Sequence, residues 1–267
     1  MSASAVDGVE IESGDGVLRI TLDRPDRKNA LDVAAVRRIV AALESAATDD
    51  ALRVVVLGGR GADFCAGADW IASNAAGGRP RTGSLQRRTA LQAHRLIELL
   101  TELQLPVVCG VRGWAAGLGF QLALAADFAI AATSACFWEP FLERGFSADS
   151  GSTWLLPRLV GIARAKELLL LGRKLSGEEA AAWGLVHRAV PDAELDAAVA
   201  ALVERLAQGP TVAIGLTKRS LLRSLDAGLV EAMQGESFAL ELASRTGDFK
   251  EGLLAFKERR AARFEGR

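Results

Sequence analysis

The chain has almost no net charge. It carries 32 lysines and arginines against 33 aspartates and glutamates, which leaves a formal net charge of −1. Proteins that bind nucleic acid or anionic membranes depend on a positive field, so we expect neither kind of partner. A polyanionic ligand would have to be held by a local cluster of basic side chains.

Cysteines are few, and long apolar runs are absent. Cys65, Cys109 and Cys136 lie in apolar stretches, are odd in number and lack metal-type spacing. These features argue against a disulfide framework and a zinc site, so we expect no metal and a reducing compartment. The first residues lack the layout of a signal peptide, and no apolar run free of charges and Gly or Pro approaches 18 residues. A soluble, cytoplasmic protein is expected.

Strand and helix patterns alternate over the first half of the chain. Short strands near residues 9–13 and 16–22 precede a helical pattern over 30–47 and an apolar run at 54–57. A loop at 72–88, rich in Gly, Ser and Arg, leads into a predicted helix over 89–103, and strands at 107–111 and 126–132 flank a Gly-rich segment. This order predicts an α/β core, whereas the pattern beyond Gly145 predicts helices only.

Four segments resemble the enoyl-CoA hydratase/isomerase (crotonase) family, and they occur in the family's order. They are RPDRKNALD at 24–32, FCAGADW at 64–70, GWAAGLGFQLALAADFAIA at 113–131 and GSTWLLPRLVG at 151–161. The resemblance implies a spiral core of ββα units, here expected over residues 1–200, and a helical C-terminal oligomerisation region over 201–267. It also implies assembly as a homotrimer or a homohexamer.

Two small-residue motifs suit the stabilisation of a thioester enolate. Negative charge that develops on a thioester oxygen is held well by two fixed backbone N–H donors, and small residues let a ligand approach the backbone. A Gly-rich turn that opens an apolar helix adds the partial positive charge of the helix N-terminus. By resemblance, the two donors are the N–H groups of Ala68 and Leu118.

The resemblance also implies an acyl-coenzyme A substrate, with coenzyme A as part of the thioester and no prosthetic group. Arg24 and Lys28 belong to a compact basic loop that suits phosphate. The adenine end is expected near Ala66 and the following residues, including Asp69 and Ile71. Phe256 and Arg259, in the last helix, match family positions that touch the nucleotide, often from a neighbouring subunit.

The acid and base residues differ from those of the hydratases. Hydration of a double bond needs one group to activate water and one to deliver a proton, which the family achieves with two glutamates. Gln121 and Phe141 stand at those positions, and neither side chain exchanges protons at neutral pH. Asp149 supplies a carboxylate instead, at a position that some isomerases, the dienoyl-CoA isomerases and the 4-chlorobenzoyl-CoA dehalogenase branch use for a catalytic aspartate.

The leading hypothesis is therefore an enzyme that shifts a double bond in an enoyl-CoA, with Asp149 as acid and base. One alternative is an enoyl-CoA hydratase that uses a shifted glutamate, Glu139 or Glu143. Another is an acyl-CoA-binding protein without catalysis, in which Asp149 only caps a helix. His94 falls where the dehalogenase branch has a histidine, but that branch's aromatic partners are absent, so an ordinary helix histidine is favoured. The loop at 72–88 and the side chains of Trp70, Phe120, Phe141 and Phe146 are expected to shape the acyl pocket.

Overall fold

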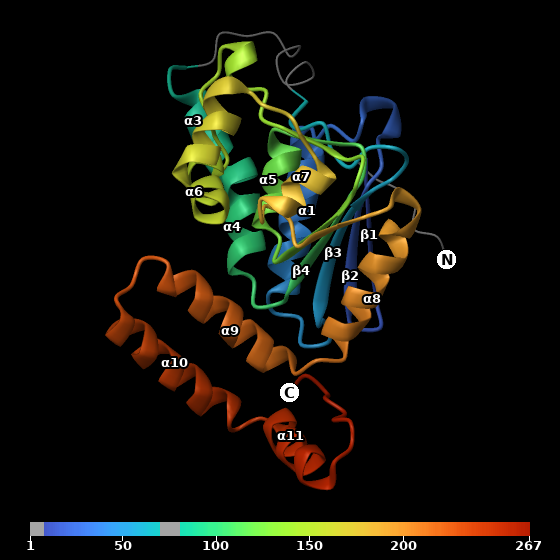
Figure 1. The fold of residues 1–267 in the computed structure, drawn as a ribbon, viewed down its shortest axis with the longest axis vertical. Helices are drawn as coiled ribbons and strands as arrows, with labels where there is room; N and C mark the ends of the chain where they lie inside the picture. Colours follow the sequence, from blue (N-terminus) through green and yellow to red (C-terminus); the bar gives the residue numbers. More distant parts are fainter. Residues whose placement is uncertain (1–7, 70–80) are drawn as a thin grey trace.

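A computed structural model describes residues 8–69 and 81–267. Within them, six strands form a mixed sheet in the order β1-β2-β3-β4-β6-β9 (Figure 1). β1 and β2 pair antiparallel, and every later neighbour in the sheet is parallel. The strands are β1 (Val9–Gly14), β2 (Val17–Leu22), β3 (Val54–Gly59), β4 (Val107–Val111), β6 (Phe128–Ala132) and β9 (Arg188–Val190).

A smaller sheet lies next to the Gly-rich segments. Among the described residues it has the order β5-β7-β8, with β5 at Trp114–Ala116, β7 at Cys136–Trp138 and β8 at Leu175–Ser176. A single bridge between Cys65 and Ala115 joins the segment at 64–68 to this sheet. The backbone of residues 64–68 therefore lies beside the strand that leads into the second Gly-rich motif.

Helices cover both faces of the large sheet (Figure 1). The first half contains α1 (Val33–Ala46), α3 (Ser84–Thr89), a π-helical turn (Ala90–His94), α4 (Arg95–Glu102) and α5 (Leu118–Ala125). The second half contains α6 (Ser152–Leu171), α7 (Gly177–Ala182), α8 (Leu195–Ala207), α9 (Thr211–Ser224), α10 (Leu229–Ala243) and α11 (Gly247–Glu258). Short 3-10 turns lie at Pro25–Arg27, Leu142–Arg144 and Asp192–Glu194.

β3 shows why the central strands read as continuous apolar runs. Val54 and Val56 face one side, where they pack in a cluster with Val203 of α8. Val55 and Leu57 face the main core on the other side. Side chains alternate along a strand, so a strand buried on both faces must be apolar at every position.

The prediction that only helices follow Gly145 is wrong, because β8 and β9 are strands. Both are too short to show a period of two, and each depends on a neighbouring strand for its hydrogen bonds. α6 contains a break at Gly161, whose φ is 78°. None of the described helices is long and apolar enough to cross a membrane.

The C-terminal arm, defined here as α9, α10 and α11, extends away from the large sheet (Figure 1). Arg53, which precedes β3, ties the start of this arm to the sheet. Its guanidinium donates to Thr211 Oγ1, Gly209 O and Phe264 O. Lys218 of α9 donates to two backbone carbonyls and to Asp127 Oδ2, at 2.7 Å. The division of the chain at residue 200 stays a prediction, and residue 200 itself lies within α8.

Candidate active site

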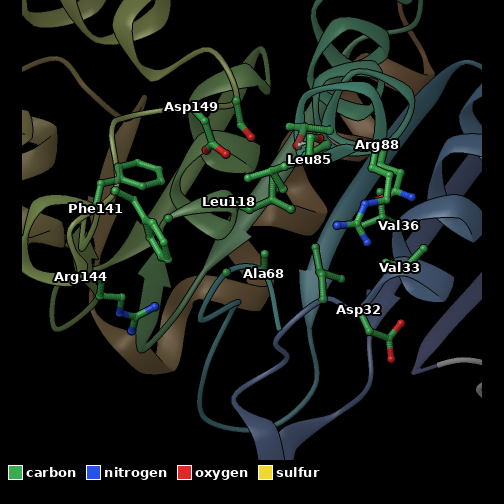
Figure 2. A pocket seen from close by; sticks show the side chains of 18 of the residues that line it. Asp32, Val33, Val36, Ala68, Leu85, Arg88, Leu118, Phe141, Arg144 and Asp149 are labelled. Carbon is green, nitrogen blue, oxygen red and sulfur yellow. Dashed lines mark hydrogen bonds between the residues drawn. The ribbon is translucent and has the colours of Figure 1, made fainter. Parts of the chain in front are cut away.

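One cavity of about 480 Å³ lies between the Gly-rich motifs and the helices that cover them. Its lining residues come from five segments: 31–36, 66–68, 81–93, 117–118 and 140–150. Figure 2 shows Ala68, Leu118 and Asp149 around the same space, with Val36 and Arg88 on the opposite side. The cavity thus brings together the three residues that the sequence assigned to the chemistry.

The predicted oxyanion donors lie on two neighbouring segments. Leu118 is the first residue of α5, so its N–H has no partner within the helix. Neither the Ala68 N–H nor the Leu118 N–H donates to another residue of the described chain. α5 is buried along its whole length, so its N-terminal partial positive charge acts in a dry environment. Both donors are available to an oxyanion in the cavity.

Two glycines allow the donor segments to approach each other. A Cβ on Gly67 would lie 2.7 Å from Ala116 O and 3.4 Å from Leu118 N. A Cβ on Gly119 would clash with the carbonyl oxygen and side chain of Cys65. Gly67 also has a φ of 99°, which side-chain-bearing residues rarely adopt. Glycine is therefore required here for both space and backbone conformation.

Asp149 lines the cavity and is half-buried. It precedes a sharp turn in which Ser150 has a φ of 48° and Gly151 a φ of 84°, and α6 starts directly afterwards. Gly151 is the N-cap of α6, and no side chain of the described residues caps that helix. Burial raises the pKa of Asp149, and this is partly offset by a hydrogen bond from Ser150 and by nearby His94. A carboxyl group with a raised pKa is a better proton acceptor once ionised.

The two positions of the family's glutamates have different surroundings. Phe141 lines the cavity, whereas Gln121 is fully buried and is not part of the cavity wall. Glu139 is 2% exposed, is not part of the cavity wall and accepts hydrogen bonds from Gln121. Glu143 is exposed beside Gly172 and also lies outside the wall. The structure thus gives no direct access from either glutamate to the cavity.

Arg24 is held by neighbouring carboxylates. Its guanidinium lies 3.2 Å from Asp32 Oδ2 and 3.2 Å from Asp69 Oδ2, and it also donates to Ala30 O. Asp32 in turn caps α1 by accepting from Ala35 N. Arg24 therefore fixes the start of α1 against the 64–69 segment, and a phosphate would have to compete with two carboxylates for it.

Two other predicted nucleotide-binding residues, Lys28 and Ala66, are among those that the structure describes. Lys28 is exposed, with its Nζ 5.2 Å from the centre of the Trp114 ring. Ala66 lines the cavity and donates its N–H to Lys28 O. Ile71 lies outside the described residues. These placements leave Lys28 more accessible than Arg24.

Phe256 and Arg259 are not brought to the cavity within one chain. Phe256 is 86% exposed on α11, and Arg259 ends that helix in the left-handed conformation. Figure 1 places α11 at the end of the molecule opposite α3, which borders the cavity. A contact between these residues and a nucleotide at this cavity requires a second copy of the chain.

The prediction for the acyl pocket needs two corrections. Phe120 is fully buried and packs on Phe137, with ring centres 5.2 Å apart, so it belongs to the core rather than to the pocket. The helical segment begins at Ser84 rather than at residue 89, and Leu85, Arg88 and Gln92 line the cavity. Their spacing of three and four residues was the available signal for a helix face. Trp70 lies outside the described residues.

Comparisons with known proteins agree with this site. A family model described as enoyl-CoA hydratase/isomerase matches residues 12–267. The 1,2-epoxyphenylacetyl-CoA isomerase of Escherichia coli K12 is 37% identical over 254 residues, which cover 94% of this chain and 96% of that protein. A protein of Rhodobacter capsulatus named "Probable enoyl-CoA hydratase" is 38% identical over 261 residues, 97% of this chain and 98% of its own length.

A solved structure extends the agreement to the fold. The crystal structure of enoyl-CoA hydratase from Bacillus anthracis has a TM-score of 0.90 and 32% sequence identity, and it covers 97% of this chain and 100% of its own. The fold expected from the four segments is therefore confirmed, although the relatives carry both hydratase and isomerase names. The chain belongs to the enoyl-CoA hydratase/isomerase family of enzymes and has the crotonase fold.

Proposed function

We propose that the protein shifts a double bond in an enoyl-CoA thioester, with Asp149 as the group that moves the proton. The observation that carries this proposal is the presence of Asp149 on the wall of the cavity that also contains Ala68 and Leu118. Asp32 is another carboxylate on this wall, but it caps α1 and is paired with Arg24. Asp149 is therefore the better-placed proton acceptor.

The reaction needs only one acid/base group. Asp149 removes a proton from C2 of a 3-enoyl-CoA, and the electron pair moves onto the thioester oxygen. The N–H groups of Ala68 and Leu118 donate to that oxygen and stabilise the enolate. Asp149 then returns the proton at C4, which leaves the double bond between C2 and C3. The product therefore has the same composition and mass as the substrate. The raised pKa of Asp149 suits both transfers.

The family's hydration reaction uses two glutamates, and neither is present on the described wall of this cavity. Gln121 and Phe141 cannot exchange protons, and Glu139 is buried away from the cavity wall. The relative from E. coli is named as the isomerase of an epoxyacyl-CoA, so its name supports isomerisation of a CoA thioester but does not specify a double-bond shift. The relative from R. capsulatus is named as a probable hydratase, which keeps hydration as the competing reaction.

Mass and absorbance together distinguish the reactions. The protein is incubated with trans-2- and 3-enoyl-CoA thioesters, and each product is analysed by mass spectrometry and by the absorbance of the conjugated thioester. Isomerisation predicts conjugation of a 3-enoyl-CoA at constant mass. A gain of one water on a trans-2-enoyl-CoA at an efficient rate would instead identify a hydratase. Tight binding of these thioesters without turnover of either kind would identify a non-catalytic binding protein.

We also propose that the chain assembles with copies of itself through the C-terminal arm. α10, which the structure describes throughout, has no buried residue in a single chain. Its Leu229, Val230, Phe238 and Leu240 are 64–76% exposed. Apolar patches of this kind mark interaction surfaces, and closed symmetric oligomers are the usual way to bury them. A trimer or a hexamer would also supply Phe256 and Arg259 from a neighbouring copy.

A further inference from the structure

Behind the cavity lies a chain of three buried polar side chains, here called the buried polar link: Glu139, Gln121 and Ser152. Gln121 Nε2 donates to both carboxyl oxygens of Glu139, each at 3.0 Å, and to Ser152 Oγ at 2.8 Å. Gln121 and Ser152 are 0% exposed, and Glu139 is 2% exposed. Polar groups are expensive to bury, so a fully buried set of three needs a reason.

The link ends on the backbone of the proposed base. Ser152 Oγ donates to Asp149 O at 2.8 Å, and Ser152 N donates to the same oxygen at 3.1 Å. Between them, Ser150 has a φ of 48°, which a residue with a side chain adopts only under constraint. The two hydrogen bonds to Asp149 O hold this turn closed. The direction of the Asp149 side chain therefore depends on where Ser152 Oγ is held.

The other end of the link is the helix of the oxyanion hole. Gln121 follows Leu118 by three residues on α5, so the two are one turn apart. α5 is fixed at its start because Gly117 N donates to Trp138 O, directly before Glu139. One amide group thus connects the helix that carries an oxyanion donor to the turn that carries the base.

We propose that Gln121 is a positioning residue for the reaction, which fixes Asp149 relative to the oxyanion donors through Ser152 and is itself oriented by Glu139. This inference rests on the proposed role of Asp149. In this chain, the side chain at the family's first glutamate position exchanges no proton and instead sets the geometry between the enolate oxygen and the base.

The orientation of the amide depends on Glu139. Gln121 Oε1 is buried and has no hydrogen-bond partner in the described part of the chain, so the Nε2 contacts must hold the amide in place. Burial raises the pKa of Glu139 well above its usual range. The group is thereby held toward its neutral form, and a neutral carboxyl still offers a carbonyl oxygen to Gln121 Nε2. A glutamine at position 139 offers the same acceptor.

The main test is Gln121→Met, which keeps the length of the side chain and removes its hydrogen bonds. We expect kcat for isomerisation of 3-hexenoyl-CoA to fall about 10-fold or more, because misplacement of a reacting group by about 1 Å is worth on the order of 10²-fold. The dissociation constant of hexanoyl-CoA should stay within about threefold, since the oxyanion donors and the outer cavity are unchanged. A variant that lost kcat and affinity in proportion would contradict a positioning role.

Ser152→Ala removes one hydroxyl group and tests the next step of the link. It should lower kcat as Gln121→Met does, at unchanged affinity. If Gln121→Met does not fold, Ser152→Ala tests the inference in its place. Because both variants break one connection, the double variant should be no slower than the slower single variant. Independent, multiplying effects would overturn the inference. Glu139→Gln should retain most of kcat, whereas Glu139→Met should behave as Gln121→Met does.

Two further measurements separate this inference from the proposed function. If Gln121 acts through Asp149, Gln121→Met should have no additional effect in an Asp149→Asn background. Loss of activity in Asp149→Asn with full kcat in Gln121→Met and Ser152→Ala would overturn this inference alone, whereas full activity in Asp149→Asn would overturn the proposed function. Ser45→Ala, at an exposed position near the end of α1, is the matched control and should keep wild-type kcat.

Discussion

Asp149→Asn is the substitution on which the proposed reaction depends. The amide keeps the size of the carboxylate and most of its hydrogen-bonding shape, but it cannot accept the proton from C2. General acid/base groups contribute about 10²–10⁴-fold, so kcat for a 3-enoyl-CoA should fall at least about 10²-fold, or about 2.7 kcal/mol of transition-state stabilisation. Affinity for a saturated acyl-CoA should hardly change, because the donors at Ala68 and Leu118 are backbone groups.

The structure also predicts the effect on stability. Burial raises the pKa of Asp149 above that of the unfolded chain, so the fold disfavours the ionised carboxylate. This carboxyl group contributes most to the free energy of unfolding at low pH, where it is neutral in both the folded and the unfolded chain. The contribution falls as pH rises above the ordinary pKa of an aspartate and is lost once pH exceeds the raised pKa of the folded state. An amide avoids this loss. The melting temperature of Asp149→Asn at neutral pH should therefore equal or exceed that of the wild type.

The rate should depend on pH in the opposite direction. Asp149 accepts a proton only when ionised, so kcat of the wild type should rise with pH through the raised pKa of this carboxyl group. The Asn variant should lack this rise. The assay is initial-rate absorbance of the conjugated thioester, with Asp50→Asn, at an exposed position, as the control. Wild-type turnover in a folded Asp149→Asn protein would refute the assignment of the base.

Three further substitutions test the surroundings of the site. Gly119→Ala places a Cβ against Cys65 O, so it should displace an oxyanion donor and lower kcat by about 10²-fold or more, measured with the same assay. Lys218→Met leaves the Asp127 carboxylate, whose side chain is 22% exposed, without its cation, and urea unfolding should show a loss of about 1–3 kcal/mol. Phe238→Glu adds charge to the exposed face of α10, so sedimentation should show a smaller assembly than the wild type.

Each of these has a matched control. Gly14→Ala, at the end of β1, meets no atom within 4 Å and should leave kcat unchanged. Arg245→Met breaks an exposed ion pair with Glu241 and should change stability by less than about 1 kcal/mol. Gln234→Glu is the control for Phe238→Glu, because it adds the same charge to α10 at a polar position. A wild-type protein that sediments as a 28.2 kDa monomer would contradict the proposed assembly.

Residues close together in the sequence were enough to identify the family and the chemistry of its oxyanion hole. The motifs at 64–70 and 113–131 contain glycines because their backbones approach each other and adopt positive φ values, and such requirements are visible in the residue types themselves. The lack of glutamates at 121 and 141, and the presence of Asp149, were equally readable. Together with the resemblance to the family, these features indicated a thioester enolate and a single base without any tertiary information.

Only the tertiary structure decided how the remaining polar groups are used. Glu139 was considered as a substitute catalyst, yet it is buried against Gln121, and Arg24 was assigned to phosphate, yet it lies between two carboxylates. The short strands β8 and β9 exist because neighbouring strands supply their hydrogen bonds. In each case the partner is distant in sequence or in another element, so the free energy of the contact depends on packing that no local pattern records.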